Sequence, residues 1–370
     1  MKRKIAFVTA TPMTATSFLL DFFKELSKEN EVFLISSCND DLVIEGVRVI
    51  NVKIERKVSI FHDILALIRL VSIFKSYRFD IVHSVTPKAG LLSMVAATVA
   101  GIKARFHTFT GQVWVNKTGI KRLTLKIADK ITASCASHIL VDSNSQRNFI
   151  ITEGIVTSSK SSVLAHGSIS GVDTKRFSPS AEVRCSVRNE LSIEESDFLF
   201  LYLGRVNSEK GIPELLKAFS LLQTRVAIKN SVKLLIVGPD EEQLLSEVFV
   251  DDVIILGSTG QPEKYMMAAD LFCLPSHREG FGTVIIEAAS CGIPSIGSNI
   301  YGIQDSILDG YSGLLHKVFD AEDICDKMFF FIDNNAALKS YSSQAKERAI
   351  KHFASSNLTQ ALISFYNTRL

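Results

Sequence analysis

The chain has 370 residues, of which 46% are hydrophobic and 22% are charged. This length is typical of two domains, and the composition excludes a globally disordered chain. Six cysteines are scattered along the sequence without a Cys-x-x-Cys pair. This pattern argues against a disulfide scaffold, a zinc ribbon or a thioredoxin-type site, and it fits a reducing cytosol.

The net charge of +2 conceals a basic first half and an acidic second half. Residues 1–165 contain 22 Lys and Arg against 13 Asp and Glu, whereas residues 166–370 contain 19 against 26. A basic half indicates contact with something anionic, although two independently soluble domains would show the same split. The longest uncharged apolar stretch, 89–102, is shorter than the roughly 20 residues of a membrane span. The basic start lacks the apolar block and cleavage site of a signal peptide, so we expect a cytoplasmic protein.

Short apolar runs alternate with helical patterns along the first half. Helices are expected between the runs, for example at 16–28 and 60–77. The predicted strands cover residues 4–9, 31–36, 48–52, 81–84, 104–108 and 138–141. Strands that alternate with helices predict βαβ units and a parallel sheet.

A second series of the same kind follows. Its predicted strands cover residues 198–204, 232–238, 253–256, 271–274 and 295–297. Its predicted helices cover 213–224, 241–248, 263–269 and 283–291, and beyond Ala321 the chain is expected to be helical to its end. The stretch 164–188 is rich in Gly, Ser and charge and is poor in periodicity, as a domain boundary often is.

The predicted fold class is therefore α/β, with two doubly wound parallel-sheet domains of the Rossmann-like type. We expect a first domain at 1–168 and a second at 169–352, facing each other across a cleft. A terminal helix at about 353–370 is expected to pack back onto the first domain. Ligands of open α/β sheets bind at the carboxyl ends of the strands, so the cleft is the expected binding site.

Two cations lie on one predicted strand-to-helix loop. The buried run 198–204 ends in Gly204-Arg-Val-Asn-Ser-Glu-Lys-Gly211, and Pro213 suits the first turn of the next helix. Arg205 and Lys210 would then form a clamp for a diphosphate, because Arg can grip phosphate with two hydrogen bonds and Lys acts as a point charge. An ordinary solvated loop remains the alternative for this feature taken alone.

Two glutamates flank the start of a predicted helix at 283–291. The first backbone N–H groups of that helix, from Phe281, Gly282 and Thr283, would form an anion site at its positive end. Glu279 precedes this site, and Glu287 lies one helical turn beyond Thr283. Two carboxylates beside an anion site suit a sugar nucleotide, since one can accept hydrogen bonds from ribose and the other from a hexose hydroxyl. Taken singly, Glu279 also fits a helix cap and Glu287 a solvated helix position.

These residues resemble those of retaining glycosyltransferases of family four, which have the GT-B fold, and in particular the members that build bacterial capsule, O-antigen and other surface polysaccharides. Glu279-x7-Glu287 matches the paired-glutamate motif of that family, and the loop 204–211 matches its diphosphate loop. The segment 171–179 matches the link between its two domains. The resemblance covers essentially the whole chain.

The resemblance implies a role for each matched residue. The run Ala104-Arg-Phe-His-Thr108 is similar to the strand end that carries the family's histidine of the first domain, so His107 and Glu279 are the expected catalytic residues. The expected substrate-binding residues are Arg205, Lys210, Glu287, Phe281, Gly282 and Thr283. No Asp-x-Asp triplet occurs, which favours a metal-independent enzyme without a cofactor, in which Arg205, Lys210 and the helix start neutralise the diphosphate.

The function that the resemblance implies is transfer of a hexose or N-acetylhexosamine from a UDP-sugar donor. The expected acceptor is a lipid-linked glycan of the undecaprenyl-diphosphate type, bound by the first domain, and no nucleic acid partner is expected. Helix 117–131 is basic and amphipathic: its cations recur at Arg122, Lys126 and Lys130 beside an apolar stripe of Leu123, Ile127 and Ile131. Such a helix suits a peripheral contact with the inner face of the cytoplasmic membrane, and an ordinary surface helix is the alternative.

Three other functions compete with transfer. A GT-B-fold sugar-nucleotide epimerase would share the architecture but would need no second substrate. A dinucleotide-dependent oxidoreductase is disfavoured, because Ile285 occupies the third glycine position of Gly-x-Gly-x-x-Gly and the first strand has no glycine-rich turn. A non-catalytic subunit is disfavoured by the intact pair of glutamates and the intact cations.

Overall fold

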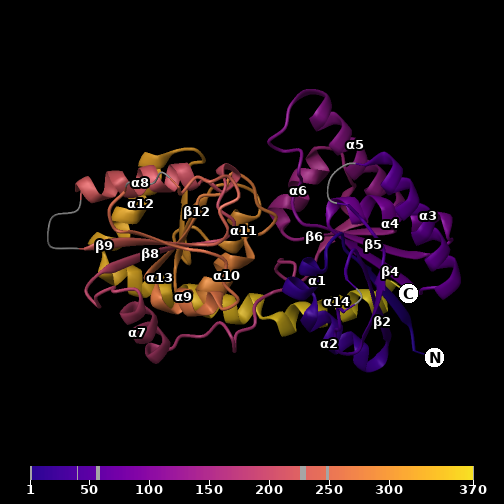
Figure 1. The fold of residues 1–370 in the computed structure, drawn as a ribbon, viewed down its shortest axis with the longest axis horizontal. Coiled ribbons are helices and arrows are strands. Elements are labelled where there is room, and N and C mark those ends of the chain that lie inside the picture. The colour runs from indigo at the N-terminus through magenta and orange to yellow at the C-terminus, as the bar shows by residue number, and fades with distance from the viewer. Residues whose placement is uncertain (1, 40, 56–58, 226–230, 247–249, 370) are drawn as a thin grey trace. The chain divides into compact units, whose positions relative to one another are not determined.

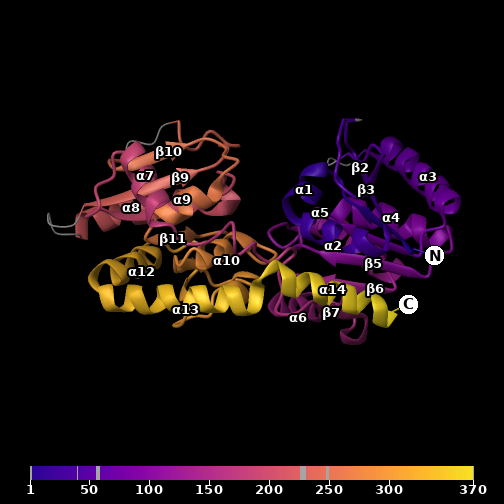
Figure 2. The same cartoon turned by 90° about the horizontal axis from the view of Figure 1, so that it is seen from below.

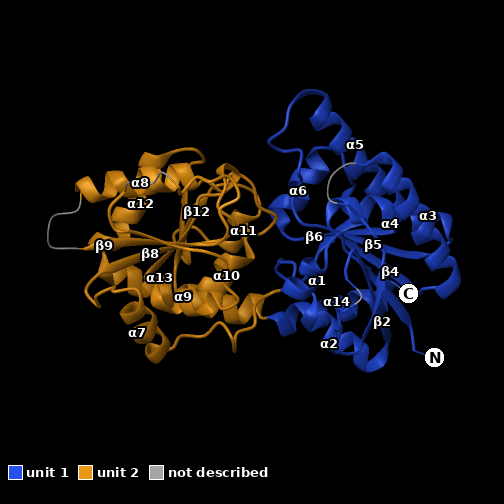
Figure 3. Ribbon diagram, in the orientation of Figure 1, with its two compact units in different colours: residues 1–170, 355–370 blue, residues 171–354 orange. Residues whose placement is uncertain are grey.

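The computed structural model describes residues 2–39, 41–55, 59–225, 231–246 and 250–369. The chain divides into two compact units (Figure 3). Unit 1 comprises Met1–Ser170 and Ser355–Leu370, and unit 2 comprises Gly171–Ala354. The chain therefore leaves unit 1 after Ser170, two residues later than the boundary expected from the sequence, and returns to it at Ser355.

Unit 1 is built on a seven-stranded sheet in the order β3-β2-β1-β4-β5-β6-β7, with every strand pairing parallel. Its strands are β1 Lys4–Val8, β2 Glu31–Ser36, β3 Val47–Asn51, β4 Ile81–Val85, β5 Ala104–Phe109, β6 His138–Val141 and β7 Ser161–Val163. The short strand β7 was not predicted, because Ser161 and Ser162 give it no apolar run. In register, Ser84 of β4 lies opposite His107 of β5.

Helices cover both faces of this sheet (Figures 1 and 2). They are α1 Pro12–Phe18, α2 Leu20–Glu29, α3 Ile60–Tyr77, α4 Pro87–Val99, α5 Gly119–Cys135, α6 Asn144–Thr152 and α14 Ser355–Arg369. Alternate residues of a strand point to opposite faces, so Ala6 and Val8 of β1 pack in the core with α3 and α4, whereas Ile5 and Phe7 pack with α2 and α14. The predicted helix 16–28 is two helices in the structure, since Pro12 starts a helix earlier and Leu19 separates it from the next.

Unit 2 repeats the design with a six-stranded parallel sheet in the order β10-β9-β8-β11-β12-β13. Its strands are β8 Phe198–Leu203, β9 Val232–Val237, β10 Val253–Leu256, β11 Leu271–Leu274, β12 Ser295–Ser298 and β13 Gly313–His316. The predicted fold class of two Rossmann-like parallel-sheet domains is therefore confirmed.

The helices of unit 2 are α7 Ala181–Glu190, α8 Ile212–Arg225, α9 Pro262–Ala268, α10 Thr283–Ser290, α11 Ile303–Ser306, α12 Ala321–Asp333 and α13 Asn335–Phe353. Helix α7 was not predicted and begins inside the stretch 164–188, where the domain boundary was expected; Ser180 caps it by accepting a hydrogen bond from the Val183 amide. The predicted helix 241–248 is absent from its described part, 241–246, which forms bends and turns, and its other two residues lie outside the described ones.

Within the described residues, no helix is both long enough and apolar enough to cross a membrane.

Candidate active site

The loop after β8 carries the two predicted cations. Arg205 lies two residues after the end of the strand, and Lys210 ends a short 3-10 turn at Ser208–Lys210 before α8 begins. Tyr202 holds the start of the loop, because its hydroxyl donates a hydrogen bond of 2.6 Å to the carbonyl of Arg205. Asn207 holds its end by accepting a hydrogen bond of 3.1 Å from the Lys210 amide. Both cations are therefore on one anchored loop at the carboxyl end of β8.

A glycine brings this loop against the loop that follows β11. Gly211 has a positive φ of 72°, and a Cβ added there would lie 2.1 Å from the carbonyl oxygen of Pro275. Only glycine fits such a close approach with that backbone conformation. The contact places the residue before Gly211, which is Lys210, beside the loop that carries Glu279.

Lys210 donates a hydrogen bond from its ammonium to Oε1 of Glu279. The same carboxylate oxygen accepts a hydrogen bond of 2.9 Å from the hydroxyl of Ser276. The side chains of Lys210 and Glu279 are each less than one-fifth exposed, so solvent screens their interaction only partly. The structure thus pairs Lys210, which was predicted to bind phosphate, with Glu279, which was predicted to bind the sugar. Ser276 was not predicted as a site residue, although it lies in the same run, because a lone serine carries no distinctive signal.

Arg205 has a different carboxylate partner. Its guanidinium lies 3.1 Å from Oε2 of Glu241, an oxygen that also accepts a hydrogen bond of 2.8 Å from the Asn207 side chain. Gly238, just after β9, permits this arrangement, because a Cβ there would lie 1.8 Å from the carbonyl oxygen of Gly204. The pair is nearly half exposed and therefore contributes little to stability, which leaves Arg205 able to exchange Glu241 for a phosphate at low cost.

A further ion pair ties the two loops together. Arg278 donates to both carboxylate oxygens of Glu209, at 3.0 and 2.8 Å, and the His277 amide donates to the Glu209 carbonyl at 2.9 Å. A two-pronged pair of this kind fixes orientation as well as distance. The residues adjoining Lys210 and Glu279 are therefore clamped, and the sequence offered no signal for this because the partners are far apart along the chain.

Helix α10 begins at Thr283, which is where an anion site was predicted. Gly282 precedes Thr283 with a φ of 76°, and its carbonyl accepts from the Ile285 amide. The Phe281 side chain is buried edge-on against Phe353 at 5.3 Å, so this residue can offer a ligand only its backbone. Because the first amides of a helix have no partner within it, the start of α10 offers hydrogen-bond donors near Glu279 in the chain.

The second glutamate has other neighbours. Burial raises the pKa of Glu287 to about 7, an effect that Arg176 opposes and Glu263 reinforces. Arg176 and Glu263 themselves form an ion pair at 2.8 Å. The charges that act on Glu287 therefore come from Arg176 and α9, whereas Glu279 is paired with Lys210, so the two glutamates sit in separate electrostatic environments.

His107 lies on β5 of unit 1 and is fully buried. Its Nδ1 is 2.8 Å from the Ser84 hydroxyl, and its Nε2 has no hydrogen-bond partner among the described residues. Burial lowers the pKa of the imidazole to about 3, so His107 is neutral at physiological pH. A Cβ on Gly90 would lie 2.3 Å from Cε1 of His107, so helix α4 needs glycine at this point to leave room for the ring.

The neighbouring histidine, His83, points to the opposite face of the sheet. Its Nδ1 is 2.6 Å from the Tyr366 hydroxyl of α14, and its Nε2 is 2.7 Å from Thr108 Oγ1. Both ring nitrogens are satisfied, and burial lowers the pKa to about 3. His83 therefore connects α14 to the sheet.

The structure corrects the expected basic face of helix α5. Arg122 and Lys126 both turn to Glu153, at 3.2 and 2.5 Å, and both lie over the ring of Trp114. These two cations are occupied within unit 1, which the sequence could not show because Glu153 and Trp114 are brought in by the fold. Among the described residues, no group of three His, Cys, Asp or Glu side chains is placed to hold a metal ion.

Comparison with known proteins places these features in a family. The family model of glycosyl transferases group 1 matches residues 184–348, and that of the glycosyl transferase 4-like domain matches residues 29–164. A capsular polysaccharide biosynthesis glycosyltransferase of Staphylococcus aureus, CapM, is 28% identical over 100% of this chain and 98% of its own length. A UDP-Gal:α-D-GlcNAc-diphosphoundecaprenol α-1,3-galactosyltransferase of Escherichia coli is 27% identical over 80% of this chain and 78% of its own.

Solved structures agree in fold. Anabaena HepE, crystallised with UDP-glucose, superimposes with a TM-score of 0.82 at 17% identity, and the alignment covers 99% of each chain. The lipopolysaccharide glycosyltransferase WaaG superimposes with a TM-score of 0.76 at 16% identity over 96% of this chain and 98% of its own. The two family models, the full-length relatives and the shared two-domain architecture show that the chain belongs to the group 1 glycosyltransferases, enzymes with the GT-B fold.

Proposed function

We propose that the chain transfers a hexose or N-acetylhexosamine from a UDP-sugar to a lipid-linked glycan of the undecaprenyl-diphosphate type, with retention of the anomeric configuration. The product would be an intermediate of a bacterial capsule, O-antigen or related surface polysaccharide. The names of the relatives support this assignment, since CapM acts in capsule biosynthesis and the Escherichia coli relative uses UDP-galactose and a diphosphoundecaprenol acceptor.

The observation that carries the proposal is the pairing of Lys210 with Glu279 beside the start of α10. An ammonium, helix amides and a carboxylate on adjoining loops offer one partner for each part of a sugar diphosphate. The ammonium and the amides attract the phosphates, and the carboxylate accepts hydrogen bonds from sugar hydroxyls. Arg205 adds a second cation, and the carboxyl group of Glu287 would accept hydrogen bonds from the ribose.

In the proposed reaction, the bond between the anomeric carbon and the β-phosphate oxygen breaks while the acceptor hydroxyl forms the new glycosidic bond. The departing phosphate takes the hydroxyl proton, so UDP and the glycosylated acceptor are the only products. Lys210, Arg205 and the α10 amides would stabilise the charge that grows on the phosphate, which makes a metal ion unnecessary. Glu279 and neutral His107 would contact the donor sugar and hold it in a reactive orientation.

Unit 1 is proposed to bind the acceptor, whose lipid is held in a bilayer. The excess of cations in its half of the sequence suits a diphosphate-linked glycan. We therefore also propose a peripheral location on the inner face of the cytoplasmic membrane.

Thermal unfolding in EDTA with equal concentrations of UDP, GDP or NAD tests the donor class first. A ligand at a hundred times its dissociation constant stabilises by about 2.7 kcal/mol, which a melting curve resolves. Of the three nucleotides, only UDP should raise the melting temperature. Stabilisation by GDP alone would indicate a GDP-sugar donor instead of a UDP-sugar, and stabilisation by NAD alone would overturn the proposed sugar transfer. An NMR analysis of the product with a diphospholipid acceptor then reports the anomeric configuration. Formation of an epimerised UDP-sugar without acceptor would show an epimerase instead.

A further inference from the structure

The outer surface of helices α3 and α5 in unit 1 is unusually apolar. Large apolar side chains that solvent can reach are concentrated in unit 1, and two rows of them follow these helices. On α3 the exposed fractions range from 48% to 75%, for Leu65, Ile64, Ile68, Phe61 and Ile60. On α5 they range from 43% to 81%, for Ile131, Ile127, Leu123 and Ile120.

The two rows lie on one side of the sheet. Both helices pack against α4, which lies between them (Figure 1). Each uses its other face for the core, where Ala66, Leu70 and Phe74 of α3 and Ala133 of α5 are buried. The outward rows therefore cannot be explained by packing within unit 1.

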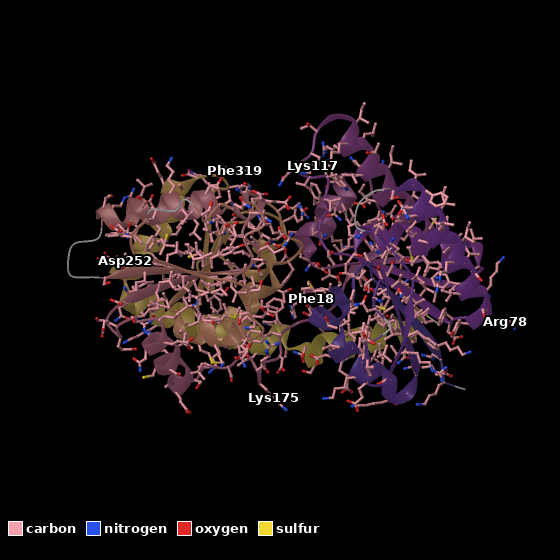
Figure 4. The ribbon with its side chains drawn as sticks, viewed as in Figure 1. Phe18, Arg78, Lys117, Lys175, Asp252 and Phe319 are labelled. Atoms are coloured by element: carbon pink, nitrogen blue, oxygen red, sulfur yellow. The ribbon has the colours of Figure 1, made fainter. Side chains whose placement is uncertain are left out.

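The apolar part of α3 is its beginning. Exposed residues from Ile60 to Ile68 are apolar except for His62, whereas the later exposed positions include Arg69 and Lys75. Arg78, just after the helix, extends away from the unit (Figure 4). A helix that follows a parallel strand begins near the carboxyl edge of the sheet, which is the edge at which ligands bind. The starts of α3 and α5 thus lie towards the edge where strand β5, which carries His107, ends.

The charges on this surface have one sign. Both helices are described throughout, and none of their exposed residues is an acid. The one acid of α3, Asp63, is paired with Lys88 at 2.6 Å, and the one acid of α5, Asp129, is buried and accepts a hydrogen bond from the Trp114 indole. The exposed cations are Arg69, Lys75, Lys121 and Lys130.

We propose that the first half of α3, together with the outer row of α5, is the surface by which this protein docks onto an anionic lipid bilayer. Apolar side chains bordered by cations, without acids, match the interface of a bilayer with negatively charged headgroups. A second copy of the chain fits less well, because a symmetric contact would bring the same cations against one another. The inference deepens the proposed function by naming the surface that would hold the enzyme beside its lipid-linked acceptor.

Vesicle flotation of the full chain tests this docking surface. The pair of variants is Ile64→Glu on α3 and Ile350→Glu on α13, since these two isoleucines have similar exposed fractions of 52% and 45%. Wild type and Ile350→Glu should float with phosphatidylcholine vesicles that contain phosphatidylglycerol. Ile64→Glu should lose at least about tenfold in vesicle partitioning, because a charge would have to enter the apolar interface.

Other outcomes would overturn the proposal. These are the absence of flotation by wild type, an equal loss in both variants, or a wild-type dimer in analytical ultracentrifugation that Ile64→Glu dissociates. Transfer to an acceptor solubilised in detergent is measured in parallel and should be unchanged in Ile64→Glu. Intact flotation without any glycosyl transfer would contradict the proposed transfer activity alone, whereas transfer without flotation would contradict the docking surface and the peripheral location but leave the transfer activity standing.

Discussion

Lys210 and Glu279, 69 residues apart in the sequence, form an ion pair across two loops at the carboxyl ends of β8 and β11. The pair exists because Gly211 lets the first loop touch the Pro275 carbonyl and because Arg278 clamps Glu209. Each partner would have to exchange the other for a part of the donor. A diphosphate would bind Lys210, and a sugar hydroxyl would donate a hydrogen bond to Glu279. In the free site, the ion pair between the two side chains keeps both of them positioned for these contacts.

Replacement of Glu279 by Gln should separate catalysis from nucleotide binding. Turnover should fall by about 10²–10³-fold, as when a charged or polar group is lost from a transition-state contact. The dissociation constant of UDP should stay within about threefold or become smaller, because Lys210 is released from its partner for the phosphates. Steady-state kinetics and UDP calorimetry measure the two effects. Equal losses in turnover and UDP affinity would contradict a role at the sugar.

Replacement of Lys210 by Met should have the opposite profile. UDP affinity should drop by about tenfold or more, since a partly buried charge-assisted contact to phosphate is worth about 1.5–3 kcal/mol. The matched control is Lys217→Met on the exposed face of α8, which should bind UDP as wild type does. If both variants bound UDP equally well, the ammonium of Lys210 would have no part in the diphosphate site.

Two glycines with the same backbone angle test the contact between the loops. Gly211 and Gly310 both have a φ of 72°, but a Cβ at Gly211 would lie 2.1 Å from the Pro275 carbonyl, whereas one at Gly310 meets nothing within 4 Å. Gly310→Ala should cost about 1–2 kcal/mol of unfolding free energy for the left-handed conformation alone. Gly211→Ala should cost more and should also weaken UDP binding. Identical melting temperatures and UDP affinities in the two variants would show that the loops do not need this close approach.

Glu287 should make stability depend on pH. Burial raises its pKa to about 7, so between about pH 4.5 and 7 the folded chain binds more protons than the unfolded chain. The destabilisation that results from burying the ionised Glu287 carboxylate is absent below that pH range, grows as the pH rises through the range and is complete above it. Glu287→Gln should therefore be more stable than wild type at pH 8, by up to about 3 kcal/mol, and little different at pH 4.5. The exposed Glu182→Gln on α7 serves as control, and a stability difference that is the same at both pH values would contradict the prediction.

Replacement of Gly90 by Ala should lower turnover in the same way as removal of the His107 side chain. The added methyl group would occupy the space of the imidazole, whose Cε1 lies 2.3 Å from it, and the ring would have to leave its contact with Ser84. Turnover should fall nearly as far as in His107→Ala, while helix α4 remains intact because alanine favours helices. Gly257→Ala, where a Cβ meets nothing within 4 Å, should leave turnover unchanged. Full activity in Gly90→Ala would remove His107 from the donor-sugar contact.

Much of the architecture could be predicted from the sequence. Buried parallel strands appear as continuous apolar runs, and the runs at Glu31–Ser36, His138–Val141 and Leu271–Leu274 match observed strands end for end. Helix α3 was predicted with both of its ends. These elements depend on local hydrophobic periodicity, which is visible in residues that are close together in the sequence.

The failures occur where local signals are weak. Strands β7 and β13 are short, and β7 contains two serines, so no apolar run marks it. The stretch 241–246 looked helical because of its composition, but its acids serve the loop after β8 instead, where Glu241 meets Arg205 and Glu242 accepts from Ser208. A distant partner thus outweighed helix propensity.

The fold class and the loops on which Arg205, Lys210 and Glu279 lie could be predicted from the amino-acid sequence, because the apolar runs of the strands and the positions of the glycines are local properties. The ion pairs could be identified only once the fold had brought the segments together: Lys210 pairs with Glu279, Arg205 with Glu241, and the cations of α5 with Glu153. It also decided which face of α3 stays uncovered. Charge pairing and burial depend on distances through space, and a linear pattern does not contain those distances until the sheets bring the segments together.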